Sequence, residues 1–158
     1  MAKKQEKTNV MRLLDQKKIE YKEYICEEAE GLTGLEIAER MGQNPEQAFK
    51  TLVTIGASKK NYVFVVPVNC ELDLKKAAKA VGEKSIEMIK SKELLPLTGY
   101  IHGGCSPIGM KKLFTTTIDS SASKFDTILF SGGRVGYQGE VKVEDIEKII
   151  PYQLADII

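Results

Sequence analysis

The most informative stretch of this chain is Gly103-Gly104-Cys105-Ser106-Pro107-Ile108-Gly109. Three glycines and a proline in seven residues cannot form the interior of a helix or strand. Glycine there costs about 0.5–1 kcal/mol relative to alanine, and proline removes an N–H donor. The stretch therefore predicts a shaped loop, whose N–H groups can point at one carbonyl or phosphate oxygen of a ligand. A plain tight turn is the alternative interpretation.

A second informative segment is Phe49-Lys50-Thr51-Leu52-Val53. Lys50 stands at the start of a predicted buried strand, where a long cation is poorly placed for packing alone. The structural alternative is a surface lysine whose stem passes the sheet edge. Similarly, Ser131-Gly132-Gly133 is either a hairpin turn or a segment that lines a pocket.

Four motifs, taken in order, resemble the bacterial YbaK/EbsC family of aminoacyl-tRNA deacylases, which are trans-editing factors. The resemblance runs from about Val10 to the C-terminus, and the motifs are Lys50-Thr51-Leu52-Val53, Leu72-Asp73-Leu74-Lys75-Lys76-Ala77-Ala78, Thr98-Gly99-Tyr100 leading into the glycine loop, and Phe130-Ser131-Gly132-Gly133. It implies an α/β fold, with a mixed, partly barrel-like sheet flanked by helices. We expect a flexible N-terminus over residues 1–7 and one editing domain over residues 8–158.

The same resemblance implies a catalytic set and a substrate-binding set. Lys50 would hold a phosphate or polarise the ester carbonyl of the acylated terminal adenosine, while the loop at Gly103 and Gly104 would supply N–H groups that stabilise an oxyanion. The expected substrate-binding residues are Thr51, Ser106, Pro107, Gly109, Ser131, Gly132, Tyr24 and Cys26.

Two positions leave the amino-acid preference open. Relatives often end the first strand with a tyrosine thought to line the pocket, and Cys26 stands there in this chain. Tyr24 lies two residues earlier, on the same face of a strand, and is the alternative. Cys105 with His102 as its base would make a thiol nucleophile. The resemblance favours a small buried hydrophobe at Cys105 instead, because many family members have an apolar residue there.

The resemblance implies cleavage of the ester of a mischarged aminoacyl-tRNA, above all Cys-tRNA(Pro), with the substrate's own thiol as the attacking group. Two alternatives remain: a sister deacylase for another small amino acid, such as Ala-tRNA(Pro), that uses water, and a non-catalytic module that binds tRNA or a synthetase. The expected partners are the acceptor end of mischarged tRNA and prolyl-tRNA synthetase, without DNA, membrane or cofactor.

Composition is that of an ordinary single domain. The chain has 158 residues, of which 42% are hydrophobic and 28% charged. No apolar run approaches the roughly 18 residues that span a membrane, and no apolar stretch follows the basic start, so we expect a cytoplasmic protein. One histidine and three cysteines without C-x-x-C spacing predict neither a metal site nor a disulfide framework.

The net charge of +1 means that any contact with nucleic acid depends on local groups of lysines. For each of three candidate groups a solvated helix or loop face is the default interpretation: Lys75, Lys76 and Lys79; Lys84, Lys90 and Lys92; Lys111 and Lys112.

Hydrophobic spacing and capping residues predict the elements. Helices are expected from Thr8 to about Lys17, over 33–42 behind a capping box, over 74–81 and over 144–150, with a further helical turn at Asn44-Pro45. Strands are expected over 19–26, 51–57, 62–68, 85–88, 114–119, 127–130 and 134–143.

Overall fold

The computed structural model describes residues 7–158, so the flexible segment predicted over residues 1–7 lies almost wholly outside the described residues. The elements follow in the order α1 (Asn9–Gln16), β1 (Tyr21–Ile25), α2 (Gly34–Arg40), β2 (Phe49–Gly56), β3 (Asn61–Pro67), α3 (Leu74–Val81), β4 (Ile86–Met88), α4 (Ser91–Thr98), β5 (Thr115–Asp119), the 3₁₀ helix η1 (Ser120–Lys124), β6 (Thr127–Ser131), β7 (Tyr137–Lys142), α5 (Val143–Ile146) and β8 (Gln153–Ala155). None of the helices in this part of the chain has the length and apolarity needed to cross a bilayer.

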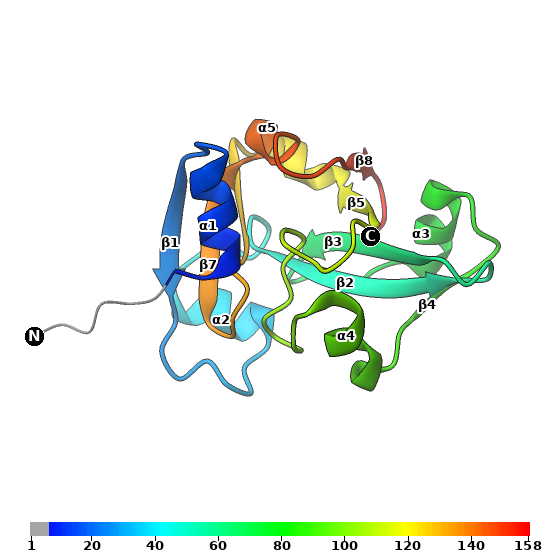
Figure 1. Ribbon diagram of the computed structural model, residues 1–158, viewed down its shortest axis with the longest axis horizontal. Coiled ribbons are helices and arrows are strands. Elements are labelled where there is room, and N and C mark those ends of the chain that lie inside the picture. The colour runs from blue at the N-terminus through cyan, green and yellow to red at the C-terminus, as the bar shows by residue number, and fades with distance from the viewer. Residues whose placement is uncertain (1–6) are drawn as a thin grey trace, which may run out of the picture.

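The strands form two sheets, ordered β1-β7-β6 and β4-β2-β3-β5-β8. The first sheet is antiparallel, whereas the second is mixed, because β3 pairs parallel with β5 and β5 with β8. A parallel bridge between Ala48 and Leu129 links β6 to the start of β2. The predicted α/β fold with helix-flanked mixed sheets is confirmed, and the strands of residues 7–158 stop short of a closed barrel (Figure 1).

Helix ends follow the capping chemistry predicted from the sequence. The Thr8 side chain accepts a hydrogen bond from the backbone at the start of α1, and Thr33 and Glu36 form a capping box on α2. Asp73 caps α3, which ends at Gly82 with φ of +74°. These helices begin and end within a few residues of their predicted positions.

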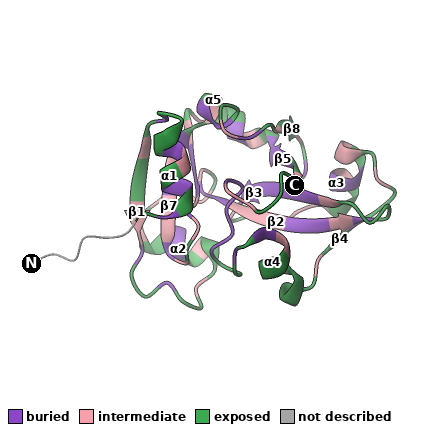
Figure 2. Cartoon of the chain, in the orientation of Figure 1, coloured by how far each residue is buried: buried purple, intermediate pink, exposed green. Residues whose placement is uncertain are grey.

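The two faces of β2 pack against different clusters, because side chains alternate along a strand. Phe49 and Val53 belong to the main core, together with residues of α1 and β6. Leu52, on the opposite face, packs with Phe64 and the helix α3. The buried stretches of β2 and β3 run through the middle of the molecule (Figure 2).

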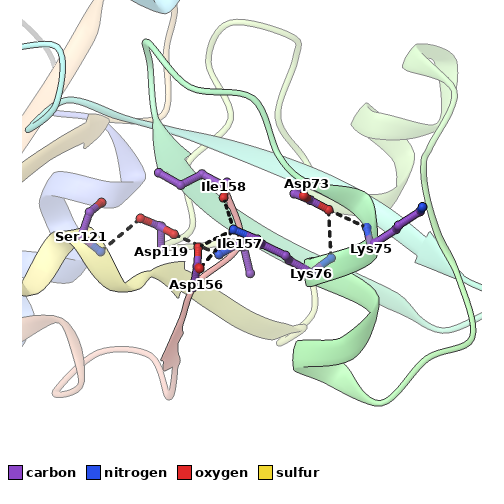
Figure 3. Close-up of polar contacts among 8 residues, drawn as sticks. All are labelled: Asp73, Lys75, Lys76, Asp119, Ser121, Asp156, Ile157 and Ile158. Carbon is purple, nitrogen blue, oxygen red and sulfur yellow. Dashed lines mark hydrogen bonds and ion pairs between the residues drawn. The ribbon is translucent and has the colours of Figure 1, made fainter.

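The C-terminal residues are fastened to α3 and β5 by polar contacts (Figure 3). The backbone N–H of Ile157 donates to the buried carboxylate of Asp119, and the carbonyl of Ile157 accepts from the N–H of Asp73. Lys76 donates to Asp156 at 3.1 Å and to the carbonyl of Ile158 at 2.6 Å. Together these hydrogen bonds hold the residues that follow β8 against α3 and β5.

Three elements differ from the sequence-based predictions. α4 was missed, since Pro96 lies inside it and the residue before it, the N-cap Lys90, makes no side-chain cap bond. β8 was missed because it is short and mostly exposed. The last helix, predicted over 144–150, is α5 over Val143–Ile146, followed by turns up to Pro151.

Candidate active site

One row of side chains crosses the three-stranded sheet on a single face. Tyr24 of β1 pairs with Gln138 of β7, and Gln138 pairs with Ser131 of β6. Residues directly opposite one another share a face. The amide of Gln138 exchanges two hydrogen bonds with that of Gln43, at 2.6 and 3.0 Å. The row thus brings together the predicted residues Tyr24 and Ser131, and adds Gln138, which the sequence analysis missed.

Lys50 joins this row through the bridge between the sheets. Ala48 and Leu129 pair in parallel, so the next residues on the same face are Lys50 and Ser131. The Nζ atom of Lys50 lies 3.9 Å from a carboxylate oxygen of Glu71, whose side chain is 97% exposed. An ion pair this long, with an exposed carboxylate, contributes little free energy to stability. The ammonium group of Lys50 is therefore able to bind a ligand.

Thr51 lies beside Lys50, at a gap in the pairing of β2. One edge of β2 is paired with β3 throughout, while the other edge meets β6 at Ala48 and β4 only from Thr54 onward. No strand within residues 7–158 pairs with residues 50–52 on that second edge. The Thr51 hydroxyl is buried and has no hydrogen-bond partner in the described part of the chain. Buried hydroxyl groups normally have at least one hydrogen-bond partner.

The glycine loop packs directly on the turn that follows Ser131. A Cβ atom on Gly104 would lie 3.1–3.2 Å from the backbone of Arg134 and Val135. One on Gly103 would lie 3.5 Å from the Val135 side chain, and Gly103 has φ of +87°. The close approach explains glycine at 104, and the left-handed backbone explains glycine at 103. The predicted loop is therefore a shaped one that adjoins the Ser131 end of the row.

Internal hydrogen bonds fix the shape of the loop. The hydroxyl of Ser106, which is 0% exposed, accepts from the N–H of Ile108, and the Tyr100 hydroxyl donates to the Ile108 carbonyl. The N–H of Gly104 donates to the carbonyl of Ile101 at 3.0 Å. By contrast, the consecutive N–H groups of Cys105 and Ser106 meet no acceptor among residues 7–158. The loop therefore holds two adjacent donors for a ligand oxygen, two residues beyond the predicted pair Gly103 and Gly104; of that pair, the N–H of Gly103 also meets no acceptor among the described residues.

The remaining loop and turn residues serve close packing. Pro107 is buried, and a Cβ on Gly109 would lie 2.7 Å from the Tyr100 hydroxyl. A Cβ on Gly132 would lie 2.7 Å from Met11 of α1. The Ser131 hydroxyl accepts from the N–H of Gly133 at 3.1 Å. The glycine loop and the turn that follows Ser131 thus pack against each other and against α1.

Tyr24 and Cys26 have different surroundings, although both lie on one face of the chain. The Tyr24 hydroxyl donates to Glu140 at 2.8 Å, and this bond raises the pKa of Tyr24. Hydrogen bonds from Thr127 and then Tyr24 lower the pKa of Glu140. Cys26 is only 4% exposed and packs with apolar residues of α2 and the segment before it.

The thiol of Cys105 is not set up as a nucleophile. Burial raises its pKa to about 12, so it is protonated near neutral pH, whereas reactive cysteines have lowered pKa values. His102 is exposed at the surface of the loop. Within residues 7–158, no three or more histidine, cysteine or acidic side chains are grouped to hold a metal ion.

This fold and site belong to a class of tRNA-editing proteins. Residues 28–149 match the family model of the aminoacyl-tRNA editing domain, so the chain belongs to that family, and the predicted resemblance is confirmed.

Individual relatives agree with this membership. A protein of Enterococcus faecalis, EbsC, named as a candidate Cys-tRNA(Pro)/Cys-tRNA(Cys) deacylase, is 47% identical over 99% of this chain and 98% of its own. A solved structure described as a candidate trans-editing enzyme for prolyl tRNA synthetase superposes with a TM-score of 0.79 at 22% identity, covering 95% of this chain and 97% of its own. A second solved structure, described as a hypothetical protein, superposes with a TM-score of 0.82 at 20% identity and covers 94% of this chain and 97% of its own. At these identities the two solved structures establish the fold alone.

Proposed function

We propose that this chain is a trans-editing deacylase, which cleaves the ester of mischarged aminoacyl-tRNA, with Cys-tRNA(Pro) as its main substrate. The substrate assignment is supported by the name of the relative that is 47% identical over almost the whole chain. The observation that carries the chemistry is the pair of unengaged N–H groups at Cys105 and Ser106, next to the row that ends at Ser131 and Lys50.

The proposed reaction needs no nucleophile from the protein. The substrate's cysteine thiolate attacks its own ester carbonyl, so a C–S bond forms, the ester C–O bond breaks, and the proton lost by the thiol ends on the ribose hydroxyl of the leaving tRNA. The cyclic thioester so released is opened by water. The task of the protein is to orient the ester and to stabilise the charge on the carbonyl oxygen in the transition state.

Each group of the site has a role in this proposal. The N–H groups of Cys105 and Ser106 bind the developing oxyanion, as the sequence analysis expected of the glycine loop. Lys50 binds the phosphate of the terminal nucleotide or the ester carbonyl, and Ser131 orients the ligand. The Thr51 side chain lies on the face of β2 opposite Lys50, together with Phe49 and Val53, so we assign its hydroxyl no contact with the ligand that Lys50 binds. We assign the pocket wall to Tyr24 rather than Cys26, because the Cys26 thiol is enclosed by apolar side chains.

The proposal extends to the setting of the reaction. The acceptor end of mischarged tRNA is the binding partner, the activity belongs to the cytoplasm, and prolyl-tRNA synthetase is the candidate protein partner. A solved structure with the same fold is described in connection with that synthetase.

A panel of radiolabelled aminoacyl-tRNAs tests the function. Incubation with the purified protein should release cysteine from Cys-tRNA(Pro) much faster than proline from Pro-tRNA(Pro). Binding of the tRNAs without release of any amino acid would contradict the deacylase and leave a non-catalytic module. Fastest release from Ala-tRNA(Pro) would move the protein to the sister deacylase that uses water.

A further inference from the structure

The structure separates the three groups of lysines that the sequence offered for contact with nucleic acid. In the group on α3, Lys76 is engaged by Asp156 and by the carbonyl of Ile158 (Figure 3). Figure 1 places α3 at the opposite end of the molecule from α1 and β1. The other two groups lie in the segment 84–112, which contains α4 and the glycine loop.

That segment carries a net positive charge. Residues 84–112 contain five lysines and two glutamates, hence a formal charge of +3 in a chain whose total is +1. Lys90, Lys92, Lys111 and Lys112 are all exposed, and none of them forms an ion pair within residues 7–158. The Lys111 ammonium donates a long hydrogen bond to the Pro96 carbonyl at 3.5 Å, which leaves its charge uncompensated, so all four charges are available to an anionic partner.

Backbone contacts bring these lysines to the two ends of α4. Lys90 and Lys92 stand at its start. At its end, the N–H of Lys111 donates to the carbonyl of Thr98, and the Lys111 side chain lies over Gly99. An eight-residue helix is about 12 Å long, so the two pairs of charges are separated by a distance that several phosphates of one strand can span.

The same helix leads directly into the candidate site. α4 ends at Thr98, and the glycine loop begins five residues later at Gly103. An RNA strand whose terminal ester reaches the loop can therefore extend over the adjoining surface of α4. Figure 1 shows α4 below the chain segment that follows it, on the outside of β2.

We propose that the exposed lysines at the two ends of α4, Lys90 and Lys92 with Lys111 and Lys112, bind backbone phosphates of the acceptor stem and so guide the acylated end to the glycine loop. The inference rests on the proposed function and names the surface that the tRNA uses. Phosphate is the matching ligand for lysines that have no ion pair, because they bind it as point charges. Leu95, Ile101 and Leu113, which are 51%, 54% and 70% exposed, lie among the lysines and offer apolar contact to riboses.

The test compares two double variants of equal charge change. In Lys111→Ala/Lys112→Ala, two proposed phosphate contacts are lost, whereas Lys75→Ala/Lys79→Ala removes two exposed lysines of α3 and is the control. Binding of uncharged tRNA(Pro) is measured over a range of salt concentrations. We expect the plot of log affinity against log salt to become shallower by about 2 for the α4 variant and to stay unchanged for the control.

A minimal substrate separates failure of this surface from failure of the proposed function. Cysteinyl-adenosine carries the ester but no stem, so the α4 variant should raise KM for Cys-tRNA(Pro) while its kcat/KM for cysteinyl-adenosine equals that of the wild type. If the Lys111→Ala/Lys112→Ala variant bound tRNA with wild-type affinity and salt dependence, the proposed phosphate-binding surface would be wrong. That result is expected if α4 binds another protein instead. If the wild type hydrolyses neither ester, the proposed function itself fails.

Discussion

Lys50 of β2 and Lys76 of the helix α3 lie on the same side of the five-stranded sheet, yet their surroundings differ. The Lys76 ammonium donates to a carboxylate at 3.1 Å and to a carbonyl at 2.6 Å, and it lowers the pKa of Asp156. The Lys50 ammonium has one carboxylate at 3.9 Å, on a fully solvated side chain. The comparison indicates that Lys76 uses its charge to fasten the C-terminal residues, whereas Lys50 keeps its charge for a ligand.

Backbone N–H groups show the same contrast. Around α3 and β5, the buried carboxylate of Asp119 accepts hydrogen bonds from two backbone N–H groups. At the candidate site, the N–H groups of Cys105 and Ser106 have no acceptor within residues 7–158. Leaving such groups unpaired costs free energy, which substrate binding recovers. The predictions below test this difference between the region around α3 and β5, where polar groups are paired, and the candidate site, where some are not.

The largest expected effect is that of Lys50→Ala. Loss of one charged contact to an oxyanion or phosphate should cost about 2–4 kcal/mol of transition-state stabilisation, or about 30- to 1000-fold in the rate of deacylation. Stability should change little, because the side chain has only one loose ion pair. The measurements are single-turnover deacylation and urea denaturation.

Lys76→Ala, on α3, is the matched control for Lys50→Ala. It should deacylate at the wild-type rate and lose up to about 1 kcal/mol of unfolding free energy, since its ion pair is solvent-accessible. If both lysine variants deacylated equally well, the distinction between the two regions would fail.

Gly104→Ala should have the next largest effect. The added methyl would lie 3.1–3.2 Å from the backbone of Arg134 and Val135, so the loop must move away from the Ser131 turn. A displacement of this kind should lower kcat/KM about tenfold or more.

Gly139→Ala is the control, because a Cβ at Gly139 meets no atom within 4 Å. Neither glycine has a positive φ, so the pair isolates close approach from backbone strain. We expect Gly139→Ala to keep full activity. Unaltered activity of a folded Gly104→Ala protein would show that contact between loop and turn is not required.

Cys105→Ala should have the smallest effect on catalysis, within about twofold, because the proposed donor at this position is the backbone N–H. The variant also has a pH signature. The pKa of this thiol is near 9 in the unfolded chain and about 12 in the fold, so between these values only the unfolded chain loses the proton. Its contribution to stability is thus complete below pH 9 and falls as pH rises toward 12.

The unfolding free energy of the wild type should therefore decline more steeply than that of Cys105→Ala above pH 9, as measured by urea denaturation at several pH values. Loss of activity by orders of magnitude in Cys105→Ala, or a covalent aminoacyl adduct on the thiol, would restore the cysteine as a nucleophile.

Local sequence signals predicted the elements that depend on neighbouring residues. The capping box at Thr33 and the Asp73 and Gly82 ends of α3 are set by contacts within one turn, and they were predicted. The glycine loop was predicted for the same reason. α4 was not, because Pro96 is a helix breaker when judged without its tertiary context.

The arrangement of the candidate site was less accessible. Gln138 is an ordinary polar residue in the sequence, and only the register of three strands places it between Tyr24 and Ser131. The availability of the Cys105 and Ser106 N–H groups, in place of that of Gly104, depends on a turn closed by the Ile101 carbonyl. The strand register is set by contacts between residues distant in the sequence, which no local pattern encodes, and the turn at Ile101 is local but has no distinctive residue pattern.

The central claim is that the protein supplies donors and position while the substrate supplies the nucleophile. The direct measurement compares the deacylation of Cys-, Ser- and Ala-tRNA(Pro) at equal enzyme concentration between pH 7 and 8.5. A thiol of pKa about 8.5 is only a few per cent ionised at neutral pH, so the rate for Cys-tRNA(Pro) should rise across this range. Ser-tRNA(Pro), with a poorer nucleophile in a side chain of similar size, should resist, and so should Ala-tRNA(Pro). Equal rates for all three substrates would show that water attacks, and would contradict the account.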